Sequence, residues 1–212
     1  ATAHIALQGA HVMDWAPMKS LPVIWLSKGA KFAPGKSIRG GVPVCWPWFG
    51  PHASDAKLPG HGYARTVMWE LVKAETLRDD RTQLTFRLIE SDATRAQWPH
   101  STPVENIVTI GKTLEIALVT RNAGSAPVTI GDAFHTYFHV GDIREARIHG
   151  LGGCPYLDKV DGGKKKQQTG AVTIGDMAAV ESGDVAVLAV VVPVAGSLVV
   201  VEPADSVSSA GT

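Results

Sequence analysis

Apolar residues along this chain occur in short runs, and Gly, Pro and Asn stand between many of them. Residues 113–121 alternate: Leu114, Ile116 and Leu118 fall on one face of an extended chain, and Glu115 and Ala117 fall on the other. This period of two predicts a half-buried strand. We expect further strands over residues 5–7, 11–15, 23–26, 67–73, 83–88, 107–110, 127–134, 146–149, 185–192 and 197–201. Many short strands with turn residues between them are typical of a sandwich or barrel.

Helical periodicity is scarce. Residues 91–97 predict one or two helical turns, with Ser91 as the N-cap and an end before Pro99. The chain has no internal repeat and no long linker, so its 212 residues predict one all-β domain with little helix. Since the chain opens directly on a strand pattern, we expect an N-terminal part of the fold to be missing from it.

Composition narrows the classes of function. Lys and Arg together number 20, as do Asp and Glu, so the chain has no general attraction for nucleic acid or an anionic membrane. The apolar run over residues 185–201 is interrupted by Pro193 and Gly196, which disfavours a membrane span. Two cysteines make no disulfide framework, and no signal peptide opens the chain, so a reduced cytoplasmic setting is expected.

The segment over residues 37–51 is rich in Gly, Pro and aromatic residues. Paired glycines after Arg39 let backbone approach a ligand, and the planar guanidinium suits an anion. The ring of Trp48 could pack on the C–H face of a sugar. The same residues would also fit a core-plugging loop with a surface arginine.

His61 stands between two glycines, with Arg65 four residues further on. Flanking glycines give the backbone unusual freedom, so the imidazole can project into a cleft. A structural histidine is the competing interpretation.

His135 lies in an aromatic stretch at the end of an expected strand, with Tyr137 on the same face. Burial and neighbouring charges can tune its pKa for acid catalysis. His61, His135 and His139 could also bind a metal, but none stands in a tight ligand spacing.

Two carboxylates are further candidates. Asp158 could accept a hydrogen bond from a sugar hydroxyl, although aspartate is also a common turn residue. Glu202 ends an apolar valine run just before a proline. A carboxylate held at the end of a buried strand is suited to act as a general base, and a solvated strand end is the simpler alternative.

Taken together, these stretches resemble one family. Residues 38–51 (IRGGVPVCWPWFGP) are similar, almost residue for residue, to the signature of the hexose-6-phosphate mutarotases, within the aldose 1-epimerase superfamily. Further similar stretches follow in the same order, over residues 58–65, 135–138, 150–152 and 156–159. The family's late Trp-Asn-Pro stretch is absent, so a late C-terminal part of the fold is also expected to be missing.

The resemblance implies a galactose mutarotase-like fold, a large twisted antiparallel β-sandwich, over residues 1–212 as one domain. It implies anomer interconversion of hexose 6-phosphates, with no cofactor and no metal. His135 would be the general acid and Glu202 the base. The phosphate would be held by Arg39 and Arg65, and the sugar would be contacted by His61 and Asp158. The partner would be a small sugar phosphate, and the chain a monomer or weak homodimer.

Three alternatives stay open at this point. The same fold could bind a sugar phosphate without catalysis, which the short C-terminal region favours. It could also act on unphosphorylated sugars, but the two arginines, which suit a phosphate, disfavour this alternative. A purely structural β-sandwich would leave the aromatic loop and the flanked His61 without an explanation.

Overall fold

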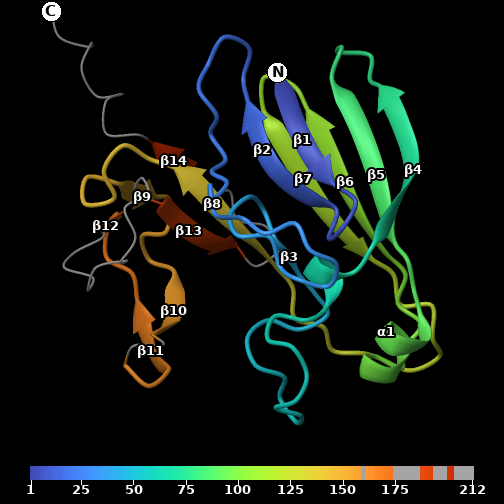
Figure 1. The fold of residues 1–212 in the computed structure, drawn as a ribbon. Coiled ribbons are helices and arrows are strands. Elements are labelled where there is room, and N and C mark those ends of the chain that lie inside the picture. Colours follow the sequence, from blue (N-terminus) through green and yellow to red (C-terminus); the bar gives the residue numbers. More distant parts are fainter. Residues whose placement is uncertain (159–160, 174–186, 193–199, 203–212) are drawn as a thin grey trace, which may run out of the picture. The chain divides into compact units, whose positions relative to one another are not determined.

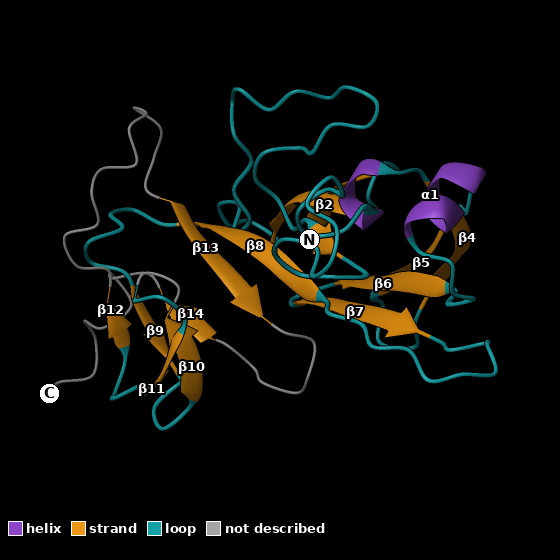
Figure 2. Ribbon diagram, turned by 90° about the horizontal axis from the view of Figure 1, so that it is seen from below, coloured by secondary structure: helices purple, strands orange, loops and turns teal. Residues whose placement is uncertain are grey.

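The computed structural model describes residues 1–158, 161–173, 187–192 and 200–202. The chain divides into two compact units, which are described separately. The first consists of Ala1–Phe138 with Ala189–Ala195, and the second of His139–Leu188 with Gly196–Thr212. The prediction of an all-β chain with little helix is confirmed, because the described elements are strands apart from two short helical segments. Figure 2 shows these strands joined by loops, some of them long. Among the described residues, no helix is long and apolar enough to cross a bilayer.

A four-stranded antiparallel meander forms the largest sheet of the first unit, in the order β4-β5-β6-β7 (Figure 1). Each strand pairs with the next along the chain. Short turns connect β4 to β5 and β6 to β7, whereas residues 89–103, which include a short helix, connect β5 to β6. On β7, Leu114, Ile116 and Leu118 face the core, as their alternation predicts. The strands of this sheet are β4 (Trp69–Thr76), β5 (Thr82–Leu88), β6 (Val104–Ile110) and β7 (Leu114–Thr120).

A hairpin of β1 (Thr2–Ala6) and β2 (His11–Ala16) contributes to the same hydrophobic core. The buried Asn106 amide of β6 donates to the carbonyl oxygen of Ala10 at 3.1 Å and ties the hairpin to the meander. This core also takes in Trp46, Trp48 and Tyr63 from the connecting segments. The aromatic loop therefore plugs the core with its indoles.

The third sheet of this unit holds β3 (Val44–Cys45), β8 (Ala133–His139) and β13 (Val187–Val192), in the order β13-β8-β3. The strand expected over residues 127–134 is wrong in its bounds, because the main chain pairs only from Ala133 onward. The strand expected over residues 23–26 forms only isolated bridges, at Ile24 to Phe138 and at Leu26 to Gly40.

Two helical segments complete the first unit. The helix α1 (Asp92–Gln97) begins where expected, and the Ser91 hydroxyl accepts from the Thr94 backbone N–H. The Thr94 hydroxyl accepts from the Ser91 backbone N–H in return, which makes a reciprocal cap. The 3-10 turn η1 (Ala64–Thr66) follows His61 and contains Arg65.

The second unit contains two small antiparallel sheets, β10-β11 and β12-β9-β14. Of the strand expected over residues 197–201, residues 197–199 lie outside the described part of the chain. The remaining two belong to β14, which ends at Glu202 and pairs that residue with Arg147 of β9. The strands of these two sheets are β9 (Arg147–His149), β10 (Pro155–Asp158), β11 (Lys164–Gln167), β12 (Val172–Thr173) and β14 (Val200–Glu202).

Candidate functional site

Two histidines, two arginines and a tyrosine lie close together in the first unit, and we call them the histidine–arginine cluster. The rings of His61 and His135 have centroids 6.1 Å apart, and the rings of His135 and Tyr137 stack at 5.0 Å. Arg65 lies near enough for its charge to act on His61, His135 and Tyr137, and the charge of Arg39 acts on Tyr137. Residues 39, 61, 65 and 135, singled out from the sequence, therefore belong to one region of the molecule.

Strand pairing brings these segments together. Strand β3 pairs with β8 through Val44 opposite Phe134 and Cys45 opposite Ala133. The pairing continues upstream of β3. The backbone N–H of His135 donates to the Pro43 carbonyl at 3.0 Å, and the backbone N–H of Tyr137 donates to the Gly41 carbonyl at 2.9 Å. The strand face carrying His135 and Tyr137 thus runs beside the loop that carries Arg39.

The His61 turn is fixed by main-chain contact with Trp46. Both Tyr63 and Ala64 donate their backbone N–H groups to the Trp46 carbonyl, at 3.1 and 3.3 Å. Gly62 has φ +71°, and a Cβ built on it would lie 1.9 Å from that oxygen, so no other residue fits without backbone movement. His61 itself has φ +67°, a conformation that few side chains adopt.

The tautomer of His61 follows from its hydrogen bonds. The Gly50 backbone N–H donates to Nδ1 of His61 at 3.2 Å, and the His61 backbone N–H donates to the Gly50 carbonyl at 2.7 Å. Because Nδ1 accepts, the neutral ring carries its proton on Nε2. The His61 ring therefore has a donor available on the side away from Gly50. The ring of Phe49 lies beside it in a tilted arrangement, with centroids 4.7 Å apart.

The two arginines of the cluster are not neutralised by carboxylates. Among the described residues, neither Arg39 nor Arg65 takes part in an ion pair. Arg39 is exposed, whereas Arg65 is half-buried and donates from Nη2 to the Gly60 carbonyl at 2.9 Å. The buried Nε of Arg65 finds no hydrogen-bond partner within the described part of the chain. Two guanidinium groups with spare donors suit an anion.

Burial and the charge of Arg65 both lower the pKa values of the two histidines. Burial lowers the pKa of His135, a backbone hydrogen bond acts in the opposite direction, and the charge of Arg65 lowers it again. The pKa of His61 is lowered by burial first, then by Arg65 and His135. Both imidazoles are therefore neutral near pH 7 in the unliganded molecule.

The other predicted site residues have different surroundings. Trp48 is 8% exposed and lies in the hydrophobic core, where its indole N–H donates to the Pro59 carbonyl at 2.9 Å. Asp158 lies in the second unit, where it accepts from Lys166 Nζ at 2.8 Å and from the Asp161 backbone N–H. Glu202 also lies in the second unit, and only its backbone is described. The sugar-contacting and base roles of these residues stay predictions.

Two further titratable groups of the first unit, one half-buried and one fully buried, did not stand out in the sequence. Burial raises the pKa of the Asp132 carboxyl group, which directly precedes β8. His11 of β2 is 1% exposed, and its Nε2 lies 2.9 Å from the Gly40 carbonyl oxygen. Nothing in the local pattern around either residue distinguishes it from an ordinary turn or strand residue.

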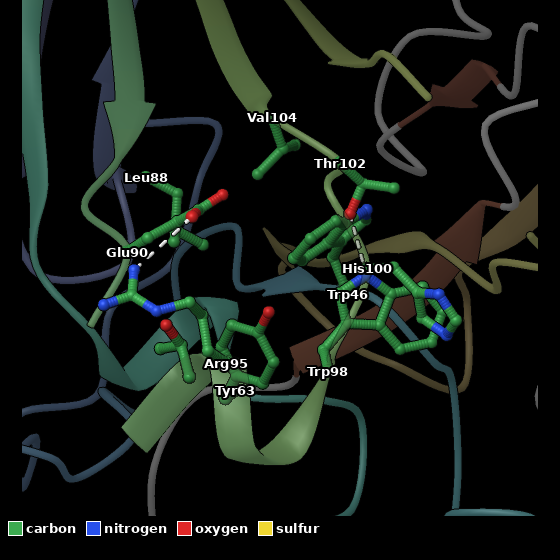
Figure 3. Close-up of a pocket in the computed structure, with 10 residues that line it drawn as sticks. Trp46, Tyr63, Leu88, Glu90, Arg95, Trp98, His100, Thr102 and Val104 are labelled. Atoms are coloured by element: carbon green, nitrogen blue, oxygen red, sulfur yellow. Dashed lines mark hydrogen bonds and ion pairs between the residues drawn. The ribbon is translucent and has the colours of Figure 1, made fainter. Parts of the chain in front are cut away.

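The first unit holds a small pocket and a larger, more open one. The small one, shown in Figure 3, has a volume of about 10 Å³ and is lined by Trp46, Tyr63 and Trp98, with the Glu90–Arg95 ion pair on one side. That volume holds about one water molecule. The open one has a volume of about 280 Å³ and is lined by residues of the 50–61 segment, including His61. The pocket beside His61 therefore has the larger capacity, enough for a small polar molecule.

The described residues contain no group of three or more His, Cys, Asp or Glu side chains placed to hold a metal ion. Burial raises the pKa of the Cys45 thiol to about 11, so this cysteine is a protonated, packed side chain. This region therefore offers two kinds of chemistry. Its histidines can donate or accept protons, and its arginines can bind an anionic ligand.

Solved structures with the same fold define the class of protein. A structure described as a "putative mutarotase" from Salmonella typhimurium superposes with a TM-score of 0.74 at 41% sequence identity, covering 82% of this chain and 57% of that one. A galactose mutarotase-related enzyme from Lactobacillus acidophilus shares the fold at a TM-score of 0.60 and 14% identity, covering 82% of this chain and 62% of its own. The fold is thus the galactose mutarotase-like one, as predicted.

Sequence comparison identifies the family. The family model of aldose 1-epimerase matches residues 1–182. Proteins named "Putative glucose-6-phosphate 1-epimerase" are 45% identical over 163 residues in Salmonella typhimurium and 44% identical over 170 residues in Escherichia coli K12. These matches cover 77% and 80% of this chain, and 53% and 55% of those relatives. The chain belongs to the aldose 1-epimerase family and spans about half the length of these curated relatives.

Proposed function

We propose that this chain forms the sugar-phosphate site of an enzyme that interconverts the α and β anomers of a hexose 6-phosphate. The observation that carries the proposal is the histidine–arginine cluster, in which two guanidinium groups without a carboxylate partner among the described residues lie near two neutral imidazoles. The names of the similar proteins support the same reaction class.

The reaction needs two proton transfers. A base removes the proton of the anomeric hydroxyl, an acid protonates the ring oxygen, and the C1–O5 bond opens. Rotation of the aldehyde and reclosure then give the other anomer. We assign the acid to His135 and the base to Glu202. Each well-positioned proton-transfer group contributes ~10²–10⁴ in rate. The chemistry contains no redox step, so it requires no cofactor.

The remaining residues bind the substrate. Arg39 and Arg65 would bind the phosphate by charge-assisted hydrogen bonds, which anchor the sugar while its reacting end turns. His61 would donate from Nε2 to a sugar oxygen, and Asp158 would accept from a hydroxyl group. A sugar contact by Trp48 stays a prediction, and its indole N–H also donates to the Pro59 carbonyl near the start of the His61 turn.

The arginines also link substrate binding to acid catalysis. The charge of Arg65 lowers the pKa of His135 in the unliganded molecule. A phosphate dianion on Arg65 would offset that charge and raise the pKa of His135. His135 would then hold a proton more readily when the substrate is present, as a general acid must.

The test is exchange NMR of glucose 6-phosphate with the full chain, measuring transfer of magnetisation between the α and β anomeric protons. Enhancement over buffer is expected for the phosphosugar, and no enhancement would refute the enzyme. Saturable binding without exchange would leave a sugar-phosphate binding protein on the same fold. Equal rates for glucose and glucose 6-phosphate would favour an epimerase for unphosphorylated sugars.

A variant pair tests the phosphate assignment. Arg39→Ala is expected to raise the Kd for glucose 6-phosphate by ~10-fold or more, since a charged hydrogen bond is lost, and to leave glucose binding unchanged. Arg78→Ala, at an exposed position in the β4–β5 turn, is the matched control and should change neither. The cytoplasmic location and the monomeric or weakly dimeric state stay predictions from the sequence.

A further inference from the structure

We propose that His11 is a positioning residue for Arg39: it holds the Gly40–Gly41 backbone in place and thereby sets the affinity for the anionic end of the substrate. The inference rests on the proposed function for its effect on the substrate. Its effect on the backbone can be measured independently of activity.

The imidazole of His11 is held inside the core by one polar contact. The residue is 1% exposed, and its Nε2 lies 2.9 Å from the Gly40 carbonyl oxygen. Because a carbonyl only accepts, Nε2 carries the proton and donates. Nδ1 is buried and finds no hydrogen-bond partner among the described residues. The ring thus makes its one directional contact with the residue that follows Arg39.

The backbone that it contacts consists of two consecutive glycines. Gly40 and Gly41 have φ values of +98° and +69°, a pair of left-handed conformations that glycine adopts readily and leaves readily. A Cβ built on Gly41 would lie 2.2 Å from Nε2 of His11, so the imidazole packs directly against this backbone. His11 therefore contacts both glycines, one by a hydrogen bond and one by packing.

Main-chain bonds fix the flanks of the same segment. The backbone N–H of Ser27 donates to the Arg39 carbonyl at 3.2 Å, and the backbone N–H of Gly41 donates to the Trp25 carbonyl at 2.6 Å. The Gly40 carbonyl belongs to the same peptide group as the Gly41 N–H, and its oxygen is held by the imidazole of His11. Losing that donor would leave this peptide group anchored by the Trp25 carbonyl alone, so the backbone that directly follows Arg39 would fluctuate more widely.

Two substitutions separate positioning from packing. His11→Gln retains a donor at the level of Nε2, whereas His11→Leu fills the space without one. Val108→Ala, at a fully buried position of β6, is the control for a general loss of core stability. Kinetics by exchange NMR on glucose 6-phosphate and glucose, and amide hydrogen exchange of Gly41, are the two readouts.

His11→Leu is expected to raise KM for glucose 6-phosphate by ~10-fold, about the worth of one hydrogen bond, with kcat and the parameters for glucose unchanged. His11→Gln should restore KM to within ~3-fold of the original value, within the usual spread of one hydrogen bond. Gly41 amide exchange should accelerate ~10-fold in His11→Leu and not in Val108→Ala under conditions that retain folding.

Two results would overturn the inference. Equal Gly41 protection with and without the imidazole would remove the positioning role, whether or not the chain is active. Equal losses for phosphorylated and free sugar would show that His11 supports the fold and has no specific link to Arg39. If the original chain shows no anomer exchange but Gly41 protection still falls in His11→Leu, the proposed reaction fails and the backbone role stands.

Discussion

Replacing Gly62 by alanine is expected to destabilise the chain much more than the same replacement at a glycine with the same backbone angle. Gly62 has φ +71° and lies against the Trp46 carbonyl, whereas Gly35 has φ +70° with no atom within 4 Å of a Cβ built on it. The two positions therefore share the conformational penalty and differ in their surroundings, since Gly62 is buried against Trp46 and Gly35 is exposed.

The size of the effect follows from the geometry. A left-handed alanine costs roughly 1–2 kcal/mol, partly offset because alanine restricts the unfolded chain. We therefore expect a net loss of about 1 kcal/mol for Gly35→Ala. At Gly62 the new Cβ would stand 1.9 Å from a backbone oxygen, so the main chain must move. That movement breaks the bonds from Tyr63 and Ala64 to Trp46, each worth about 1 kcal/mol, and with the conformational penalty gives a total loss of ~3 kcal/mol.

Urea unfolding followed by tryptophan fluorescence measures both variants against the original chain. A 3 kcal/mol loss is a large part of the 5–15 kcal/mol that holds a typical domain together, so the midpoint for Gly62→Ala should fall clearly. Phosphate binding should weaken as well, since the same turn carries His61 and Arg65. If Gly62→Ala and Gly35→Ala lost equal stability, the reasoning from the Trp46 contact would be wrong.

Three further predictions concern the histidines. Inorganic phosphate is expected to raise the pKa of His135 in a histidine NMR titration, because the dianion offsets the charge of Arg65; an unchanged or lowered pKa would contradict the link. Burial lowers the pKa of His11 from 6.5 to about 4, so below pH 6.5 the unfolded chain takes up a proton that the folded chain refuses. Stability should therefore fall as pH drops from 6.5 to about 4, by about 3 kcal/mol from this residue, and the fall should be smaller by that amount in His11→Gln. At His61, Gln reproduces a donor at Nε2 and Asn a group at Nδ1, so His61→Gln should keep more sugar affinity than His61→Asn by calorimetry, and the reverse order would refute the assigned tautomer.

Local features of the sequence determined much of the strand content. The alternation from Leu114 to Leu118 is visible in the sequence because one face of that strand is buried and the other is not. The cap at Ser91 is equally local, since its partner lies three residues away. Where pairing depends on distant segments, the pattern misled: Val128 and Ile130 look strand-like, yet pairing with β3 begins only at Ala133.

The family, and with it the residues of the expected site, could also be named from the sequence, because the segment over residues 38–51 is long and unusual. Tertiary structure decided what each of those residues does locally. It put Trp48 in the core and left Arg39 exposed, although both lie in one short segment. Burial of a ring depends on what packs over it, which neighbours in sequence do not reveal.

His11 and the tautomer of His61 show the same division. Their partners, Gly40 and Gly50, lie 29 and 11 residues away, so no local period marks them. Residue types and their order in the sequence were enough to predict which acid, base and anion-binding groups this chain contains. Which nitrogen bears the proton, and which glycine is held in place, was decided by contacts that exist only once the strands have paired.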